Sequence, residues 1–187
     1  MGSIAAGTYS NSIRAVDNAG NGATASFTVV VDTTAPSGTD IQTTNGGTAG
    51  RPDTGDTIVF TYTEQIDPGT ILAGWDGTST EVVVRFTNSS SADSVAIRNA
   101  ANSATLPFGS VALMVNVVTT TATFTATMAW SGATITVTMG SMTSGAVVTN
   151  TVPTSMNWSP SATAKDAAGN VCSATLTTES GPADVHF

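Results

Sequence analysis

Oxygen-bearing side chains that could bind a metal ion are spread widely along this chain of 187 residues. The candidates are four carboxylates and one amide: Asp32, Glu64, Asp67, Asp166 and Asn170. Calcium is bound in proteins by about six to eight oxygen atoms, supplied by carboxylates, carbonyls and amides. No EF-hand spacing is present, so a calcium site would need the fold to bring separate segments together.

Other reactive groups do not form a catalytic pattern. His186 is the one histidine, and no serine or cysteine in the sequence makes an obvious triad with it. Lys165 is the one lysine, and an internal Lys–Asn isopeptide bond would need an acidic neighbour on its own strand face, which Asp166 does not provide. Phosphate-loop and Cys/His metal spacings are absent from the sequence. We therefore predict a protein that is not an enzyme.

The composition narrows the classes of partner. The net charge is −8 and only 10% of the residues are charged. Nucleic acid and anionic membrane surfaces both select Lys and Arg, so neither nucleic-acid binding nor membrane insertion is expected. The single cysteine, Cys172, cannot form an intramolecular disulfide, and its place in a strand pattern predicts a small buried side chain.

The elements that would position the candidate residues are short strands. Residues 8–31 predict one hairpin, because apolar residues alternate in Ala23–Val31 and a turn-forming stretch, Asp17–Gly22, precedes them. Pro36 ends this segment, since proline has no N–H to donate to a ladder. An isolated hairpin is marginal in water, so this one must lean on the main domain, on another chain, or on the main sheet by strand addition.

The rest of the chain also alternates with period two and is interrupted by Gly, Asn, Asp and Pro. Convincing amphipathic helices are absent. We predict an all-β sandwich. The strands are expected at about 37–43, 57–63, 80–87, 94–99, within 108–130, and at 133–139, with a last hairpin after 152.

A five-residue motif occurs twice. Asp17–Asn21 and Asp166–Asn170 both read D-x-A-G-N, and a strand pattern follows each copy. Self-similarity of this kind is typical of tandem arrays. The predicted organisation is a C-terminal hairpin of a preceding unit with its linker, residues 1–35, followed by one complete domain, residues 36–187.

These motifs resemble a known family. Asp17–Asn21, Val31–Pro36 and Asp166–Asn170 are similar to segments of bacterial immunoglobulin-like repeats from large surface proteins and adhesins. Phe60–Pro68 is similar to the F-x-x-S-E-x-[IV]-D-P stretch of the surface-layer type, with Thr63 in place of the usual serine. The resemblance implies an immunoglobulin-like Greek-key β-sandwich. It also implies a non-catalytic spacer in an extracellular protein of the bacterial cell surface, with neighbouring repeats as partners.

The same topology would gather the metal candidates at one junction. In an immunoglobulin-like sandwich the last hairpin loop lies at the pole where the chain enters. Asp166, the turn Glu64–Asp67 and the linker residue Asp32 would then meet there. The resemblance implies a calcium ion that stiffens the junction and is bound by Asp32, Asp166 and Asn170. The alternative is that D-x-A-G-N is a self-capped turn whose Asp accepts backbone hydrogen bonds.

A binding module is the second functional interpretation. A carbohydrate or protein ligand could be held by exposed aromatic side chains or by the long loops at 44–56 and 88–105. The aromatic candidates are Tyr62, Trp75, Trp130 and Trp158. The competing interpretation is that aromatic residues this sparse belong to the core.

Overall fold

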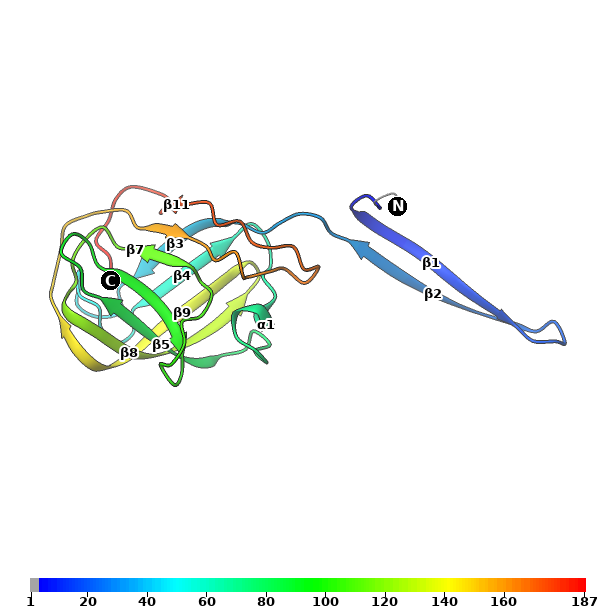
Figure 1. Ribbon diagram of the computed structural model, residues 1–187, viewed down its shortest axis with the longest axis horizontal. Helices are drawn as coiled ribbons and strands as arrows, with labels where there is room; N and C mark the ends of the chain where they lie inside the picture. The colour runs from blue at the N-terminus through cyan, green and yellow to red at the C-terminus, as the bar shows by residue number, and fades with distance from the viewer. Residues whose placement is uncertain (1–3) are drawn as a thin grey trace. The chain divides into compact units, whose positions relative to one another are not determined.

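The computed structural model describes residues 4–187 and consists mainly of β-strands (Figure 1). The chain divides into two compact units, Met1–Thr34 and Ala35–Phe187. The one helix within the described residues, α1, is the single turn Pro68–Ile71. The fold is therefore all-β, as the period-two alternation of apolar and polar residues predicts.

The first unit is a hairpin of two ten-residue strands, β1 (Gly7–Val16) and β2 (Gly22–Val31). Side chains directly opposite each other in the register share a face, as Tyr9 and Val29 do. One face carries most of the large apolar side chains, and the other carries mainly Thr and Ser. Besides Gly7 and the polar Asn11, the apolar face carries Tyr9, Ile13, Ala15, Ala23, Ala25, Phe27, Val29 and Val31.

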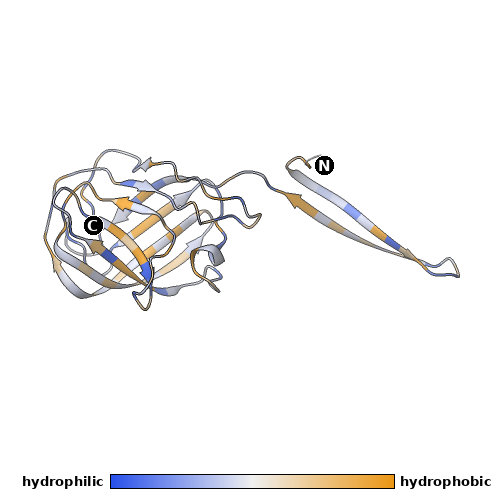
Figure 2. Ribbon diagram, viewed as in Figure 1, coloured by the Kyte–Doolittle hydropathy of each residue, from blue (hydrophilic) through white to orange (hydrophobic). Residues whose placement is uncertain are grey.

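Within residues 4–34 of the first unit, no segment covers the apolar face of the hairpin. Ile13 is 64% exposed and Phe27 is 45% exposed. Figure 2 shows separate hydrophobic segments on the hairpin ribbon, with pale and hydrophilic segments between them. Two strands with an open apolar face are marginally stable in water. Apolar and polar side chains thus alternate along the hairpin as they do in a sheet with one buried face. The layer that would bury this face is not among the described residues of the unit.

The second unit contains nine strands in one sheet. They are joined by loops, and α1 follows β4. The strands are β3 (Gly38–Thr44), β4 (Thr57–Tyr62), β5 (Thr80–Thr87), β6 (Ser94–Asn99), β7 (Ser110–Ala112), β8 (Val118–Ser131), β9 (Thr134–Val147), β10 (Asn157–Ser159) and β11 (Thr177–Thr178).

The strand order is β11-β10-β7-β6-β5-β8-β9-β4-β3, and all neighbours are antiparallel. The two edge strands adjoin: the Thr177 hydroxyl donates a 2.9 Å hydrogen bond to the Gly38 carbonyl. Ser37 and Ser173 form a parallel bridge beside them. The sheet therefore curls around a single core, and its two edge strands, β3 and β11, lie against each other.

The longest ribbon pairs β8 with β9, and each of these strands has 14 residues. Gly132 makes the tight turn between them with φ of 62°, a conformation that glycine adopts without strain. The register shifts several times between Val118 and Ala126. Bulged strands bend and twist more strongly, so this ribbon can follow the curvature of the sheet.

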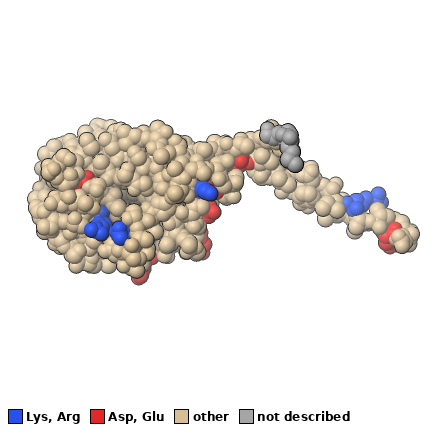
Figure 3. Space-filling view, in the orientation of Figure 1, with Lys and Arg blue, Asp and Glu red and all other residues tan. Residues whose placement is uncertain are grey.

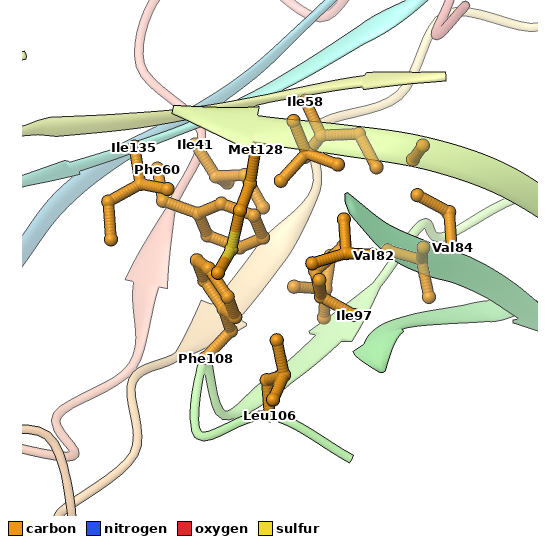
Figure 4. Packing of buried hydrophobic residues seen from close by; sticks show 14 of the residues in the cluster. Ile41, Ile58, Phe60, Val82, Val84, Ile97, Leu106, Phe108, Met128 and Ile135 are labelled. Carbon is orange, nitrogen blue, oxygen red and sulfur yellow. The ribbon is translucent and has the colours of Figure 1, made fainter. Parts of the chain in front are cut away.

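Aromatic and branched side chains fill the core of the second unit. Figure 4 shows Phe60, Phe108 and Met128 packed together beneath the sheet. The Phe60 and Phe108 ring centroids are 4.7 Å apart, and the Trp158 ring meets Phe60 edge-on at 5.2 Å. The Trp158 indole N–H donates a 2.7 Å hydrogen bond to the Phe108 carbonyl. Every member of the buried core cluster comes from residue 41 onward.

The structure decides between the two interpretations of the aromatic side chains. Trp75, Trp158 and Tyr62 are 7%, 0% and 3% exposed, and Trp130 is partly buried against the same core. The competing interpretation, that these rings are core residues, is correct. Burial of large apolar rings stabilises this fold, so they present no stacking platform for a sugar.

The surface carries few charges. Figure 3 shows scattered acidic and basic groups on a mostly uncharged face. Among the described residues, no helix has the length and apolar character needed to cross a membrane.

Candidate functional site

The turn Asp166–Asn170 is closed by its own aspartate. Asp166 Oδ1 accepts a 2.8 Å hydrogen bond from the Asn170 backbone amide, and Oδ2 accepts another of 2.8 Å from the Asn170 side-chain amide. The Gly169 amide donates to the Asp166 carbonyl at 3.1 Å. Gly169 has φ of 91°, which explains the glycine at this position.

The turn Asp17–Asn21 repeats this geometry. Asp17 Oδ1 accepts a 2.8 Å hydrogen bond from the Asn21 backbone amide, and Oδ2 accepts one of 2.8 Å from the Asn21 side chain. Gly20 also has φ of 91°. The two copies of D-x-A-G-N therefore encode the same self-capped turn, which is the structural alternative proposed for the motif.

The residues that flank the two turns also correspond. Ala164 and Cys172 pair beside the second turn, where the Cys172 amide donates a 2.9 Å hydrogen bond to the Ala164 carbonyl. Ala15 and Ala23 pair at the same distance from the first turn. Ala164 and Cys172 are 0% and 2% exposed. The second unit thus buries the face that carries Ala164 and Cys172. The corresponding face of the hairpin, which carries Ala15 and Ala23, is its apolar face.

Two of the predicted metal ligands lie close together in the second unit. A carboxylate oxygen of Glu64 lies within 4.8 Å of one from Asp166. The segments that carry them are joined by the Asp67 amide, which donates a 2.7 Å hydrogen bond to the Lys165 carbonyl. The turn after β4 and the D-x-A-G-N turn therefore meet at one end of the unit.

Asp166 keeps its charge at this position. Burial raises the pKa of Asp166, but hydrogen bonds from the Asn170 side chain and from backbone amides outweigh it and hold the pKa below the ordinary value. Two nearby carboxylates repel each other, and a divalent cation relieves that repulsion. Asp166 therefore offers a cation a charged oxygen ligand.

The remaining predicted ligands have other contacts. Asp67 caps α1, where its Oδ1 accepts a 2.9 Å hydrogen bond from the Gly69 amide. Asn170 offers its side-chain amide to Asp166, as described above. Asp32 belongs to the first unit, and its Oδ1 accepts a 2.9 Å hydrogen bond from the Thr34 amide. A ligand role for these three residues stays a prediction.

No protein-family model, curated protein or solved structure matches this chain. The resemblance to bacterial immunoglobulin-like repeats therefore rests on the motifs alone, and the residues themselves must carry any functional assignment.

Sequence reasoning missed a structural aspartate. Asp93 is completely buried, and its Oδ2 accepts hydrogen bonds of 2.7 and 2.8 Å from the Val117 and Val118 amides. Its Oδ1 accepts a third bond from the Ser89 amide at 3.0 Å. Asp93 therefore fixes the start of β8 against the loop before β6. A lone aspartate in a serine-rich stretch gave no sequence signal for this.

A second cluster was missed as well. Glu179, Asp184 and His186 bring a nitrogen and two carboxylate oxygens within 4.8 Å of one another. Asp184 and His186 are two residues apart, which puts them on the same side of an extended segment. That spacing was the available signal, but the contribution of Glu179 depends on the fold.

Proposed function

We propose that this chain is part of a tandem array of immunoglobulin-like β-domains that spaces or stiffens an extracellular protein of the bacterial cell surface. Its role is mechanical and non-catalytic. The all-β fold and the two turns of matching geometry support this proposal. In this view the hairpin β1–β2 is the end of one repeat, and Ala35–Phe187 is the next repeat.

The observation that carries the proposal is the correspondence around the two D-x-A-G-N turns. Ala164 and Cys172 face the core of the second unit, whereas Ala15 and Ala23 lie on the uncovered apolar face of the hairpin. A repeat that used the hairpin as its last two strands would bury that face in the same way. The preceding repeat would then supply the covering layer.

The strand pairing shows an all-β fold, and the immunoglobulin-like topology is a more specific part of the proposal. It draws support from the long β8–β9 ribbon, whose bulges allow one pair of strands to bend around a core. It also draws support from the curled antiparallel sheet, whose inward side chains form one continuous core. Bulged, bent strands are typical of sandwich domains in which strands pass between two layers, whereas the adjoining edges are shared with closed barrels and do not distinguish the two architectures.

Stretching single molecules tests the mechanical role. Concatenated copies of residues 35–187 should unfold in discrete, reproducible steps, one for each copy, because their long-range strand pairs must break cooperatively. Gradual extension without discrete steps would contradict the proposal. A glycan array provides the comparison with a binding module, because a spacer should bind no glycan class selectively.

Calcium at the domain junction forms the second part of the proposal. The proximity of Glu64 and Asp166 supports it, and the sequence predicts Asp32 as a further ligand from the linker. Millimolar calcium should raise the melting temperature of the chain, and Asp166→Ala should abolish the shift. Asp76→Ala is the matched control, since Asp76 lies in an exposed loop turn. An equal calcium response in both variants would remove the site from the proposal without affecting the mechanical role.

A further inference from the structure

The last residues of the second unit bring a buried imidazole against two carboxylates. His186 Nδ1 lies 3.5 Å from an Asp184 oxygen and 3.8 Å from a Glu179 oxygen. The side chains of His186 and Glu179 are 0% and 3% exposed, whereas that of Asp184 is 53% exposed. The cluster therefore has a closed inner side and one side that opens to solvent.

The other ring nitrogen fixes the tautomer. His186 Nε2 lies 3.1 Å from the Leu113 carbonyl, which can only accept a hydrogen bond. The Thr154 hydroxyl also donates to that carbonyl at 3.1 Å, and its oxygen lies 2.9 Å from Nε2. Both contacts are satisfied when Nε2 carries the hydrogen. Nδ1 then presents its lone pair to the two carboxylates, unless a second proton charges the ring.

Polar atoms in this cluster lack hydrogen-bond partners. His186 Nδ1 is buried and has no hydrogen-bond partner. The Glu179 oxygen 3.8 Å from it is Oε2, which also accepts from the Met156 amide, whereas the second oxygen of that carboxylate, Oε1, is buried and unpaired. Buried polar atoms are normally satisfied, and each exception needs an explanation. Two acceptor oxygens facing a lone pair repel it, and either a proton or a metal ion between them would remove that repulsion.

Burial acts on both ionisable side chains of the inner side of the cluster. Burial raises the pKa of Glu179 to about 7, and the nearby Asp184 and Asp40 charges add to this. Burial also lowers the pKa of His186, against the opposing influence of Asp184. The surroundings thus disfavour both the glutamate anion and the imidazolium cation, although the side chains are held face to face.

We propose that Glu179, Asp184 and His186 form a site for a zinc ion. The ligands would be Nδ1 of His186 and one oxygen from each carboxylate. Ligands of a tetrahedral zinc at about 2.0–2.1 Å lie roughly 3.3–3.4 Å from one another, close to the two separations given above. Asp184, on the open side, leaves room for a water molecule as fourth ligand and provides the entry path.

The ligand set selects the metal. A neutral imidazole with two carboxylates suits zinc, whereas calcium needs about six to eight oxygen ligands and magnesium needs near-octahedral oxygen coordination. The Nε2–H···O=C contact to Leu113 is the outer hydrogen bond that metal-binding histidines normally make. The Met156 amide holds Glu179 Oε2 at 2.9 Å in the same manner.

The proposed site has a structural consequence. Thr154 and Asp184 exchange backbone hydrogen bonds of 2.8 and 3.1 Å, and Glu179 bonds to Met156 on the same segment. A metal ion would join three side chains of the C-terminal segment beside these contacts. Zinc would therefore cross-link residues 179–187, the segment that these hydrogen bonds hold against the chain leading into β10.

Calorimetric titration of the chelator-treated chain with zinc tests this proposal. We expect one zinc per chain, with affinity reduced at least tenfold in Asp184→Asn and in Glu179→Gln. Asp184 is half exposed, so its variant should fold even if Glu179→Gln does not. Glu81→Gln is the control, because Glu81 is exposed on β5 and should leave the affinity unchanged.

Two spectroscopic readouts separate a metal from a shared proton. Cobalt in place of zinc should give the visible absorption of a tetrahedral N,O site, and zinc should shift the ¹⁵N resonance of His186 Nδ1. Absence of stoichiometric zinc binding would overturn the proposal and leave a proton shared between Glu179 and His186. Equal affinity in Asp184→Asn and Glu81→Gln would also overturn it.

Discussion

Asp17 and Asp166 close their turns with the same two hydrogen bonds from the asparagine four residues later. Asp17 is on an exposed hairpin, whereas Asp166 is 5% exposed in the second unit. The same geometry in two such different surroundings shows that the local sequence determines the turn. Tertiary packing adds burial to the second copy and leaves its hydrogen bonds unchanged.

The first prediction concerns the acid sensitivity of the hairpin. Hydrogen bonds from the Asn21 side chain and backbone lower the pKa of Asp17 below its ordinary value of 3.8. The stabilisation of the turn is therefore present above pH 3.8 and is lost as the pH falls through the lowered pKa. Amide NMR shifts of Ala19 and Asn21 should follow this loss, since both amides donate to Asp17.

Asp17→Asn is the matched control for the acid transition. The amide keeps one oxygen acceptor but does not titrate in this range. We expect its Ala19 and Asn21 shifts to stay constant where those of the wild type move. An identical pH profile in the two proteins would show that Asp17 does not control the turn.

The turns and the long strands could be predicted because their signals are local. The Asp, Gly and Asn of the D-x-A-G-N motif determine the turn geometry. The alternation of apolar and polar residues locates β1–β2, β4, β5 and β8 within a few residues. The end of β9 was missed. The prediction ended at Met139, whereas the strand continues to Val147 through residues that lack the period-two alternation and are mostly exposed. Pairing with β8 stabilises this part of the strand, and the pattern of a single sequence does not indicate which strand will pair with it.

The second prediction is that the second unit folds without the hairpin. Its buried core contains no residue before Ile41, so deletion of residues 1–34 removes none of the core contacts. The melting temperature should change by less than about 2 °C, which corresponds to less than about 1 kcal/mol for a domain of this size. Calorimetry of residues 35–187 beside the full chain measures it, and a large loss would mean that the hairpin supports the second unit.

The third prediction concerns the buried Asp93. Asp93→Ala leaves the Val117, Val118 and Ser89 amides without their acceptor. Each unsatisfied buried group costs about 1–3 kcal/mol, so a loss of about 3–5 kcal/mol in the free energy of unfolding is expected. Urea unfolding followed by circular dichroism measures it.

Asp76→Ala is the control for Asp93, because Asp76 is exposed and bonds only within its own loop, to Thr78. Its cost should stay below about 1 kcal/mol. Similar costs for the two variants would mean that water replaces the carboxylate of Asp93 at little expense.

The candidate sites were harder to predict than the fold. The expected topology placed the turn after β4 beside the D-x-A-G-N turn, and the Asp67–Lys165 hydrogen bond shows the two turns together, whereas calcium binding there stays a prediction. The buried cluster around His186 was not foreseen. It depends on the edges of the sheet adjoining and on the chain after β11 packing beside Thr154, and both are long-range events that leave no local pattern.

The fourth prediction uses the single thiol as a probe of opening. Cys172 is 2% exposed, and burial raises its pKa to about 11. The thiolate is the reactive form, so at pH 8 both burial and the raised pKa oppose labelling. We expect the native chain to react with a thiol reagent at least about a hundredfold more slowly than the urea-unfolded chain, because the native protein must first open locally.

An exposed thiol in the double variant Cys172→Ala, Ser131→Cys is the control, since Ser131 lies at the solvent-exposed tip of the β8–β9 ribbon. Native labelling as fast as that control would show that the turn Asp166–Asn170 and its flanking residues detach readily from the core.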